Sequence, residues 1–99
     1  MPIGKDVPWH AYNYASIVAN APAQSGVYAL FKSGDWIYVG ESGEIQARLL
    51  QHFNRDNPCI TQHAPTGFQF ELVAGEAQRK ARQNQLILAL KPLCNQKLD

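Results

Sequence analysis

Residues 25–40 read SGVYALFKSGDWIYVG, and this stretch decides the fold. It contains two short runs rich in β-branched and aromatic residues, 26–31 and 36–40. The residues between these runs, 32–35, read KSGD and are typical of a turn, because serine, glycine and aspartate favour tight backbone reversals. Two such runs joined through a glycine-containing turn predict a β-hairpin.

The loop of this hairpin decides on which face of the sheet each tyrosine lies, because side chains alternate along a strand. A two-residue loop would place Tyr28 and Tyr38 on opposite faces. A three-residue loop, 33–35, pairs Tyr28 with Gly40 and places both tyrosines on one face. It also pairs Leu30 with Tyr38. We expect the three-residue loop, because it collects the apolar side chains on the other face: Val27, Ala29, Phe31, Ile37 and Val39.

Two tyrosines in a hairpin are, taken alone, ordinary strand residues, because tyrosine is a good strand former. The rest of the chain changes this interpretation. In their order and spacing, its motifs resemble those of the GIY-YIG nuclease family, from Ser25 to Asn95. The matching residues are Gly26-Val27-Tyr28 and Tyr38-Val39-Gly40 for the two motifs that name the family, Arg48 for its arginine, His52 for its tyrosine-or-histidine position and Asn95 for its late asparagine.

The residues after the hairpin predict a helix over 44–53. Two stripes with four-residue spacing run along it, one apolar (Ile45, Leu49, Phe53) and one polar (Glu44, Arg48, His52). We expect the apolar stripe to be buried. Without the hairpin, the polar stripe would be a surface ion pair with an exposed histidine. With the hairpin, we expect Arg48 and His52 to face the tyrosine side of the sheet.

The other elements follow from the same periodicities. Residues 1–24 are an N-terminal lead-in with a short helix over 14–19, which Asn13 can cap. Alternating apolar residues predict a third strand over 68–73, and a last helix is expected over 76–90, before Pro92. These elements predict a small α/β (α+β) domain. The resemblance implies a three-stranded antiparallel sheet flanked by helices, which agrees with this prediction.

Length and composition predict one domain over residues 1–99, with its core at 25–95. No apolar run approaches membrane-spanning length and no secretory signal is visible, so we expect a soluble, intracellular protein of the cytoplasm. The net charge of +1 is a weak signal for nucleic-acid binding. The densest basic run, 79–82, is either a solvated helix face or a contact surface for nucleic acid.

The two cysteines, Cys59 and Cys94, fit no metal-ligand spacing. We expect reduced, buried thiols, with a disulfide as the alternative. Cys59 lies in the polar segment 54–66, which we expect to be a loop with at most one helical turn. His63, in the same segment, has no assigned role.

The resemblance implies that the protein hydrolyses phosphodiester bonds in DNA, branched or nicked DNA included, with Mg²⁺ or Mn²⁺. Such chemistry needs a nucleophilic water, a base and positive charge near the phosphate. By resemblance, Tyr28 is the base or positions the water, and Tyr38 supports it. Arg48 binds the phosphate, and His52 shares the handling of the proton.

These four residues are expected to converge on one shallow, solvent-open pocket, with Gly40 and Asn95 as supporting positions. A free tyrosine has a pKa near 10 and is a weak base at neutral pH. We therefore expect Arg48 and a metal ion to lower the pKa of Tyr28.

Two positions depart from the family pattern. The family has a metal-binding glutamate twelve residues before its late asparagine, and this chain has Gln83 there. We expect Gln83 to project towards Tyr28 and Tyr38, but a neutral amide is a poor anchor for Mg²⁺. Glu41 stands where many members have a lysine. It is expected to repel DNA phosphate or to offer a replacement ligand.

Three functions are therefore open at the level of sequence. The first is a metal-dependent DNA endonuclease of the GIY-YIG type, impaired because Gln83 occupies the glutamate position. The second is a non-catalytic nucleic-acid-binding module. The third is a protein-interaction domain that retains the nuclease fold, which the small net charge favours.

Overall fold

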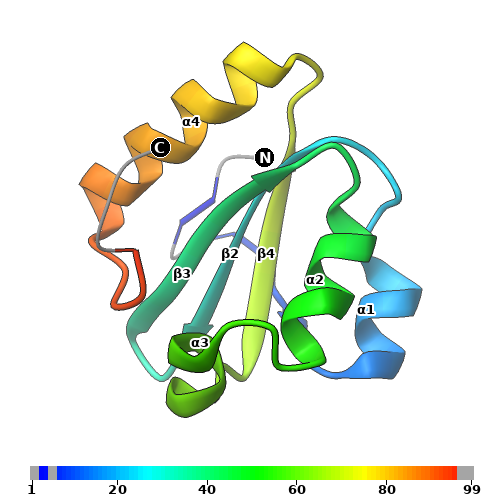
Figure 1. Ribbon diagram of the computed structural model, residues 1–99, viewed down its shortest axis with the longest axis vertical. Helices are drawn as coiled ribbons and strands as arrows, with labels where there is room; N and C mark the ends of the chain where they lie inside the picture. The colour runs from blue at the N-terminus through cyan, green and yellow to red at the C-terminus, as the bar shows by residue number, and fades with distance from the viewer. Residues whose placement is uncertain (1–2, 5–6, 96–99) are drawn as a thin grey trace.

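The computed structural model describes residues 3–4 and 7–95. These residues form a four-stranded antiparallel sheet in the order β1-β4-β2-β3, together with four helices (Figure 1). The strands are β1 (His10–Ala11), β2 (Gly26–Lys32), β3 (Asp35–Ser42) and β4 (Gly67–Leu72). The helices are α1 (Tyr14–Asn20), α2 (Ile45–Phe53), α3 (Pro58–His63) and α4 (Glu76–Leu90). None of the described helices is both long and apolar enough to cross a bilayer.

The prediction of three strands was wrong by one strand. β1 pairs with the start of β4, His10 opposite Phe68 and Ala11 opposite Gly67. A strand of two residues has no alternating pattern, so β1 could not be predicted from the sequence. The predicted short helix of the lead-in is confirmed as α1, and the side chain of Asn13 accepts a hydrogen bond from the Ser16 amide at 2.9 Å.

The β2–β3 hairpin has the predicted register at the tyrosines, with Tyr28 opposite Gly40 and Leu30 opposite Tyr38. Its turn, however, has two residues. Ser33 and Gly34 have φ values of 42° and 87°, which fits the primed turns favoured in two-residue hairpins. The register shifts after Leu30, so that Ile37 becomes an extra residue in β3. This bulge has the effect that we had assigned to a longer loop.

Helices cover both faces of the sheet, with α4 on one side and α1 and α2 on the other (Figure 1). The predicted apolar face is buried beneath Leu86 and Ile87 of α4. Its buried strand residues are Val27, Ala29 and Val39. The tyrosine face is also a core, in which Tyr28 packs with residues from α1, α2 and α3: Ile17, Ile45, Leu49 and Ile60.

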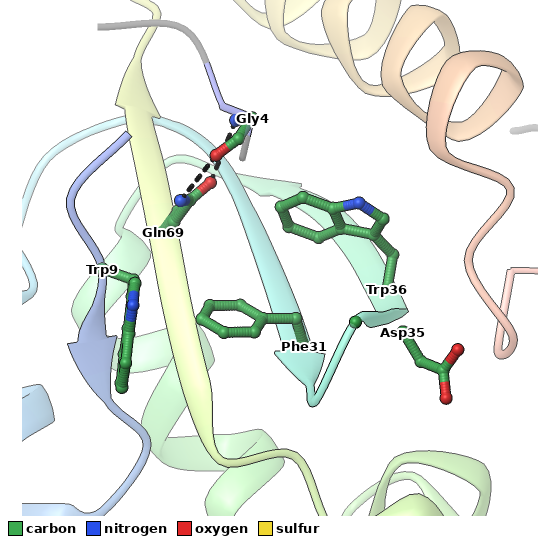
Figure 2. A pocket seen from close by; sticks show the side chains of 7 residues that line it. Gly4, Trp9, Phe31, Asp35, Trp36 and Gln69 are labelled. Atoms are coloured by element: carbon green, nitrogen blue, oxygen red, sulfur yellow. Dashed lines mark hydrogen bonds between the residues drawn. The ribbon is translucent and has the colours of Figure 1, made fainter. Parts of the chain in front are cut away.

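An aromatic pocket lies where α4 does not cover the sheet (Figure 2). The ring of Phe31 packs edge-on against Trp9 at 5.3 Å and against Trp36 at 5.7 Å between centroids. The buried amide of Gln69 binds the backbone of Gly4 with two hydrogen bonds of 3.1 and 2.9 Å. This side chain therefore ties the N-terminal segment to β4.

The segment after α4 covers the outer edge of β3. The amides of Leu93 and Cys94 donate to the carbonyl oxygens of Trp36 and Ile37 at 3.0 and 2.8 Å. Cys94 is bonded to Cys59 of α3, so the prediction of two free thiols was wrong. The two cysteines are 35 residues apart, and only the packing of α3 beside this edge brings them together.

Candidate active site

Tyr28 lies in the middle of β2 with its ring over Gly40 of β3. A Cβ atom at position 40 would overlap the hydroxyl oxygen of Tyr28 and approach the ring of Tyr38 to 3.0 Å. Glycine at position 40 is therefore required by the packing of both tyrosines. The ring centroids of Tyr28 and Tyr38 are 6.2 Å apart, on the same face of the sheet.

His52 on α2 joins the two tyrosines. Its Nε2 atom lies 2.7 Å from the hydroxyl oxygen of Tyr28, and its Nδ1 atom lies 2.9 Å from a carboxylate oxygen of Asp56. An ionised carboxylate only accepts hydrogen bonds, so Nδ1 carries the proton and donates to Asp56. In the neutral ring, Nε2 is then an acceptor, and the hydroxyl of Tyr28 donates to it. The three side chains form one directed chain of hydrogen bonds.

Burial keeps both ends of the tyrosine–histidine contact neutral. It lowers the pKa of His52, and the hydrogen bond and charge of Asp56 only partly oppose this shift. Burial also raises the pKa of Tyr28, and Tyr38 adds to the rise. Arg48 lowers the pKa of Tyr28, as predicted, but by less than burial raises it. Tyr28 is therefore a hydrogen-bond donor rather than a phenolate in this structure.

Arg48 lies at the solvent side of this group. Its guanidinium donates to Gln51 at 2.6 Å and lies 3.5 Å from the Asp56 carboxylate, and 40% of its side chain is exposed. Tyr38 is half-buried, and its ring centroid lies 5.1 Å from that of His52. The four predicted residues thus come together.

They are unequally exposed, and a solvent-open pocket formed by all four stays a prediction. Only 1% of Tyr28 and 2% of His52 is exposed, because α1, α2 and α3 close over this face.

Asn95 acts as a backbone partner for β3. Its side-chain oxygen accepts from the Val39 amide at 2.7 Å, and its side-chain nitrogen donates to the Val39 carbonyl at 2.9 Å. Val39 lies between Tyr38 and Gly40 at the edge of the sheet. The asparagine therefore holds the second motif in place without contacting a reacting group.

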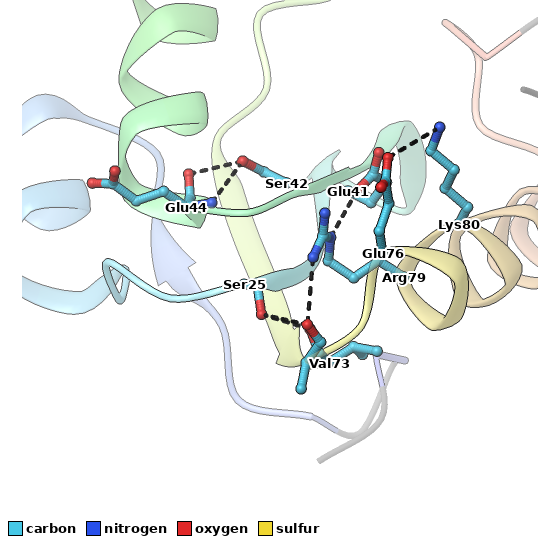
Figure 3. Close-up of polar contacts among 9 residues, drawn as sticks. Ser25, Glu41, Ser42, Glu44, Val73, Glu76, Arg79 and Lys80 are labelled. Carbon is cyan, nitrogen blue, oxygen red and sulfur yellow. Dashed lines mark hydrogen bonds and ion pairs between the residues drawn. The ribbon is translucent and has the colours of Figure 1, made fainter.

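Glu41 is paired with Arg79 of α4 at 2.9 Å, as Figure 3 shows. Both side chains are largely buried, with 18% and 14% exposed. The charge that we expected to repel DNA is thus neutralised by an arginine. Arg82 is paired with Glu71 of β4 in the same way, at 3.1 Å. Arg79 and Arg82 of the basic run 79–82 therefore form ion pairs with acidic residues of the strands. The run is not a free basic surface.

Gln83 lies on α4, one turn after Arg79, and only 4% of it is exposed. It is on the same side of the helix as Leu86 and Ile87, which pack on the sheet. The predicted packing of α4 through its apolar residues is confirmed. This turn of the helix lies beside the end of β3, since Arg79 reaches Glu41 there. The approach of Gln83 to Tyr28 and Tyr38 stays a prediction.

Sequence reasoning missed Asp56 and Tyr12. Asp56 follows α2, and Arg55 has a positive φ of 67° that turns the chain back towards His52. Asp56 continues the four-residue spacing of Arg48 and His52, and this spacing was the one signal in the sequence that could have identified it. Tyr12 lines a pocket together with His52, and its hydroxyl is buried without a hydrogen-bond partner in the part of the chain described. Burial raises its pKa, and the charge of Asp56 adds to this shift.

Comparison with known proteins gives a consistent result. No family model matches the sequence. The chain is 30% identical to UvrABC system protein C of Nitrosomonas eutropha over 94 residues, and 32% identical to that of Dictyoglomus thermophilum over 85 residues. These matches cover 90% and 82% of this chain but only 16% and 14% of the relatives.

The fold is similar to that of the GIY-YIG N-terminal endonuclease domain of UvrC from Thermotoga maritima. That domain with bound magnesium matches with a TM-score of 0.72 and 21% identity, over 83% of this chain and 94% of the other. A tyrosine-to-phenylalanine mutant with its catalytic divalent cation matches with a TM-score of 0.73, over 85% and 96%. The resemblance read from the sequence is confirmed, and the chain shares the fold of the GIY-YIG endonuclease domain.

Proposed function

We propose that this chain is a nuclease domain that binds DNA and hydrolyses phosphodiester bonds, with an activity that is impaired because Gln83 stands at the metal-binding position. The observation that carries the proposal is the hydrogen-bonded chain Tyr28–His52–Asp56 beside Arg48, at the motif positions of the family. The relatives named above include an endonuclease domain, which supports the same class of reaction.

The geometry supports a division of roles. Tyr28 donates its proton to His52, so its own oxygen can accept a proton from a water molecule. As it does so, the tyrosine proton passes to Nε2 of His52, and Asp56 stabilises the imidazolium that forms. Arg48, which is partly exposed, binds the phosphate with its planar fork. Tyr38 packs against His52 and fixes the orientation of its ring.

The family implies a divalent cation, Mg²⁺ or Mn²⁺, whose charge would assist at the phosphate. The residues of this chain do not fit a tightly held ion of this kind. Gln83 offers a neutral amide, whereas Mg²⁺ prefers carboxylate anchors. Glu41, the acidic residue beside the second motif, is paired with Arg79 and is not a free replacement ligand. We therefore expect weak metal binding and low activity.

Replacing Gln83 by glutamate tests the proposal. Gln83→Glu should bind Mg²⁺ or Mn²⁺ in a calorimetric titration and should cleave plasmid or branched DNA, because the two side chains have nearly the same shape. Gln78→Glu is the matched control, since it makes the same chemical change at an exposed position on the same helix. Cleavage by Gln83→Glu but not by Gln78→Glu would support the proposal.

A non-catalytic nucleic-acid-binding module is the second candidate. The neutral amide of Gln83 and the ion pair that Glu41 forms with Arg79 favour it. If Gln83→Glu neither binds metal nor cuts any substrate while both forms bind DNA in a salt-dependent way, this function replaces the first. If neither form binds DNA, a protein-interaction domain that retains the nuclease fold takes its place.

A further inference from the structure

Three side chains outside the motif site meet at the outer edge of β3. They are Cys59 and His63, one turn apart on α3, and Cys94, in the segment after α4. Their sulfur and ring nitrogen atoms all lie within 4.8 Å of one another, and each residue is half-buried. The bond between the two cysteines accounts for two of these residues, but it gives no role to the imidazole of His63.

The positions of these side chains are fixed by contacts that do not depend on the sulfur–sulfur bond. Asn57 caps α3 by accepting hydrogen bonds from the amides of Cys59 and Ile60, and Ile60 is buried in the core. The Cys94 amide donates to Ile37 of β3, and Asn95 holds Val39. The three donors would therefore stay close together if the disulfide were reduced.

The donor set has the chemistry of a zinc site. Two thiolates and one imidazole are borderline-soft ligands that suit Zn²⁺ and do not suit Mg²⁺. In a tetrahedral site the donor atoms are roughly 3.3–3.8 Å apart, since the bonds to zinc are about 2.0–2.3 Å long. The three donor atoms already lie within 4.8 Å of one another. Small side-chain movements would therefore bring them to the distances of a tetrahedral site once the sulfur–sulfur bond is broken.

We propose that Cys59, His63 and Cys94, in the reduced protein, bind one Zn²⁺ ion. His63 also lines a pocket, from which a water molecule can take the fourth position. The zinc site is separate from the motif residues and does not rest on the proposed nuclease function. Its role is to fasten α3 and the C-terminal segment to β3, next to Tyr38 and Val39.

The disulfide and the zinc site are alternative states of the same cysteines. A dithiol reductant converts the protein disulfide to two thiols and is itself oxidised to a disulfide. Zn²⁺ then displaces the two thiol protons and bonds to both sulfurs and to His63. In a reducing compartment protein disulfides are rare, so the zinc-bound form is the one expected there.

The test uses untagged full-length protein, reduced with a dithiol and freed of metal under anaerobic conditions. Titration with Zn²⁺ should give about one bound ion per chain and should protect both thiols from alkylation. Titration with Co²⁺ should give the thiolate charge-transfer and ligand-field absorption bands of a tetrahedral site. His63→Gln should weaken zinc binding at least tenfold, and Cys94→Ser should abolish it.

The matched control is His10→Gln, which removes a histidine of β1 outside the cluster and should bind zinc like the unchanged protein. If Cys94→Ser fails to fold, the thiol protection of the unchanged chain and the His63→Gln affinity still decide the result. Alkylation at equal rates with and without Zn²⁺ would overturn the proposal. Equal zinc affinity of His63→Gln and His10→Gln would also overturn it.

Discussion

The hydroxyl oxygen of Tyr28 lies 2.7 Å from Nε2 of His52, and both residues are almost fully buried. This contact joins β2 to α2 inside the core rather than at an open surface. Because Asp56 fixes the tautomer of the ring, the tyrosine donates and the histidine accepts. The hydrogen bond therefore contributes to the stability of the domain as well as to its proposed chemistry.

Tyr28→Phe is expected to destabilise the protein by about 1–3 kcal/mol, because it leaves Nε2 of His52 buried without a donor. Urea unfolding of the two proteins measures the difference. Tyr14→Phe is the control, since Tyr14 is 61% exposed and its loss of a hydroxyl should change little. Equal stability of Tyr28→Phe and the unchanged protein would mean that the contact is not formed in solution.

Stability should depend on pH through His52. Its folded pKa lies below its ordinary value of 6.5, because burial disfavours the charged ring. The unfolded chain therefore binds more protons in the window just below pH 6.5. The contribution of His52 to stability is complete above pH 6.5 and is lost as the pH falls through 6.5 towards the folded pKa. Urea midpoints measured between pH 8 and pH 5 give the slope.

Asp56, Arg48, Tyr28 and Tyr38 surround this ring, and the hydrogen bond to Asp56 works against the effect of burial. His52→Gln should flatten the slope. A slope that survives in His52→Gln would assign the pH dependence to other groups.

The sequence predicted the placement of the tyrosines because face and register follow from residue alternation. The actual turn has two residues, and a bulge at Ile37 restores the odd count. A three-residue loop, or a two-residue turn with a bulge, gives the same pairing of Tyr28 with Gly40. The alternation of side chains therefore specified the pairing of the strands but not the conformation of the turn.

Features that depend on tertiary packing could not be predicted in this way. The partner of His52 is Asp56, which the turn at Arg55 returns to the helix. The partner of Cys59 is Cys94, across the edge of β3. The burial of the site also depends on how α1, α2 and α3 close over it, because a periodic pattern shows which face is apolar but not what covers it.

Gly40→Ala is expected to destabilise the protein by about 1–3 kcal/mol, because the added methyl group would overlap the hydroxyl of Tyr28. Gly43→Ala is the matched control in the same chain segment, since a Cβ there meets no atom within 4 Å. The thermal midpoints of the two variants give the comparison. Similar midpoints would show that the tyrosine ring can move away from β3 at little cost.

Charge reversal at Arg48 should weaken DNA binding more than charge reversal elsewhere. Arg48 is the partly exposed cation of the motif group, whereas Arg79 and Arg82 are paired with strand acids. Arg48→Glu should therefore lower DNA affinity and reduce the salt slope of binding by about one unit. Fluorescence anisotropy with labelled linear and branched DNA at several salt concentrations measures both quantities.

Lys32→Glu is the matched control, because Lys32 is an exposed cation at the hairpin turn. Lys32→Glu and Arg48→Glu change the net charge by the same amount, so a general loss of attraction to phosphate would weaken DNA binding equally in both variants. A larger loss for Arg48→Glu would place the DNA phosphate near the Tyr28–His52 contact. Equal losses would instead indicate diffuse electrostatic attraction, and the proposed roles of Tyr28 and His52 would then lose their support from DNA binding.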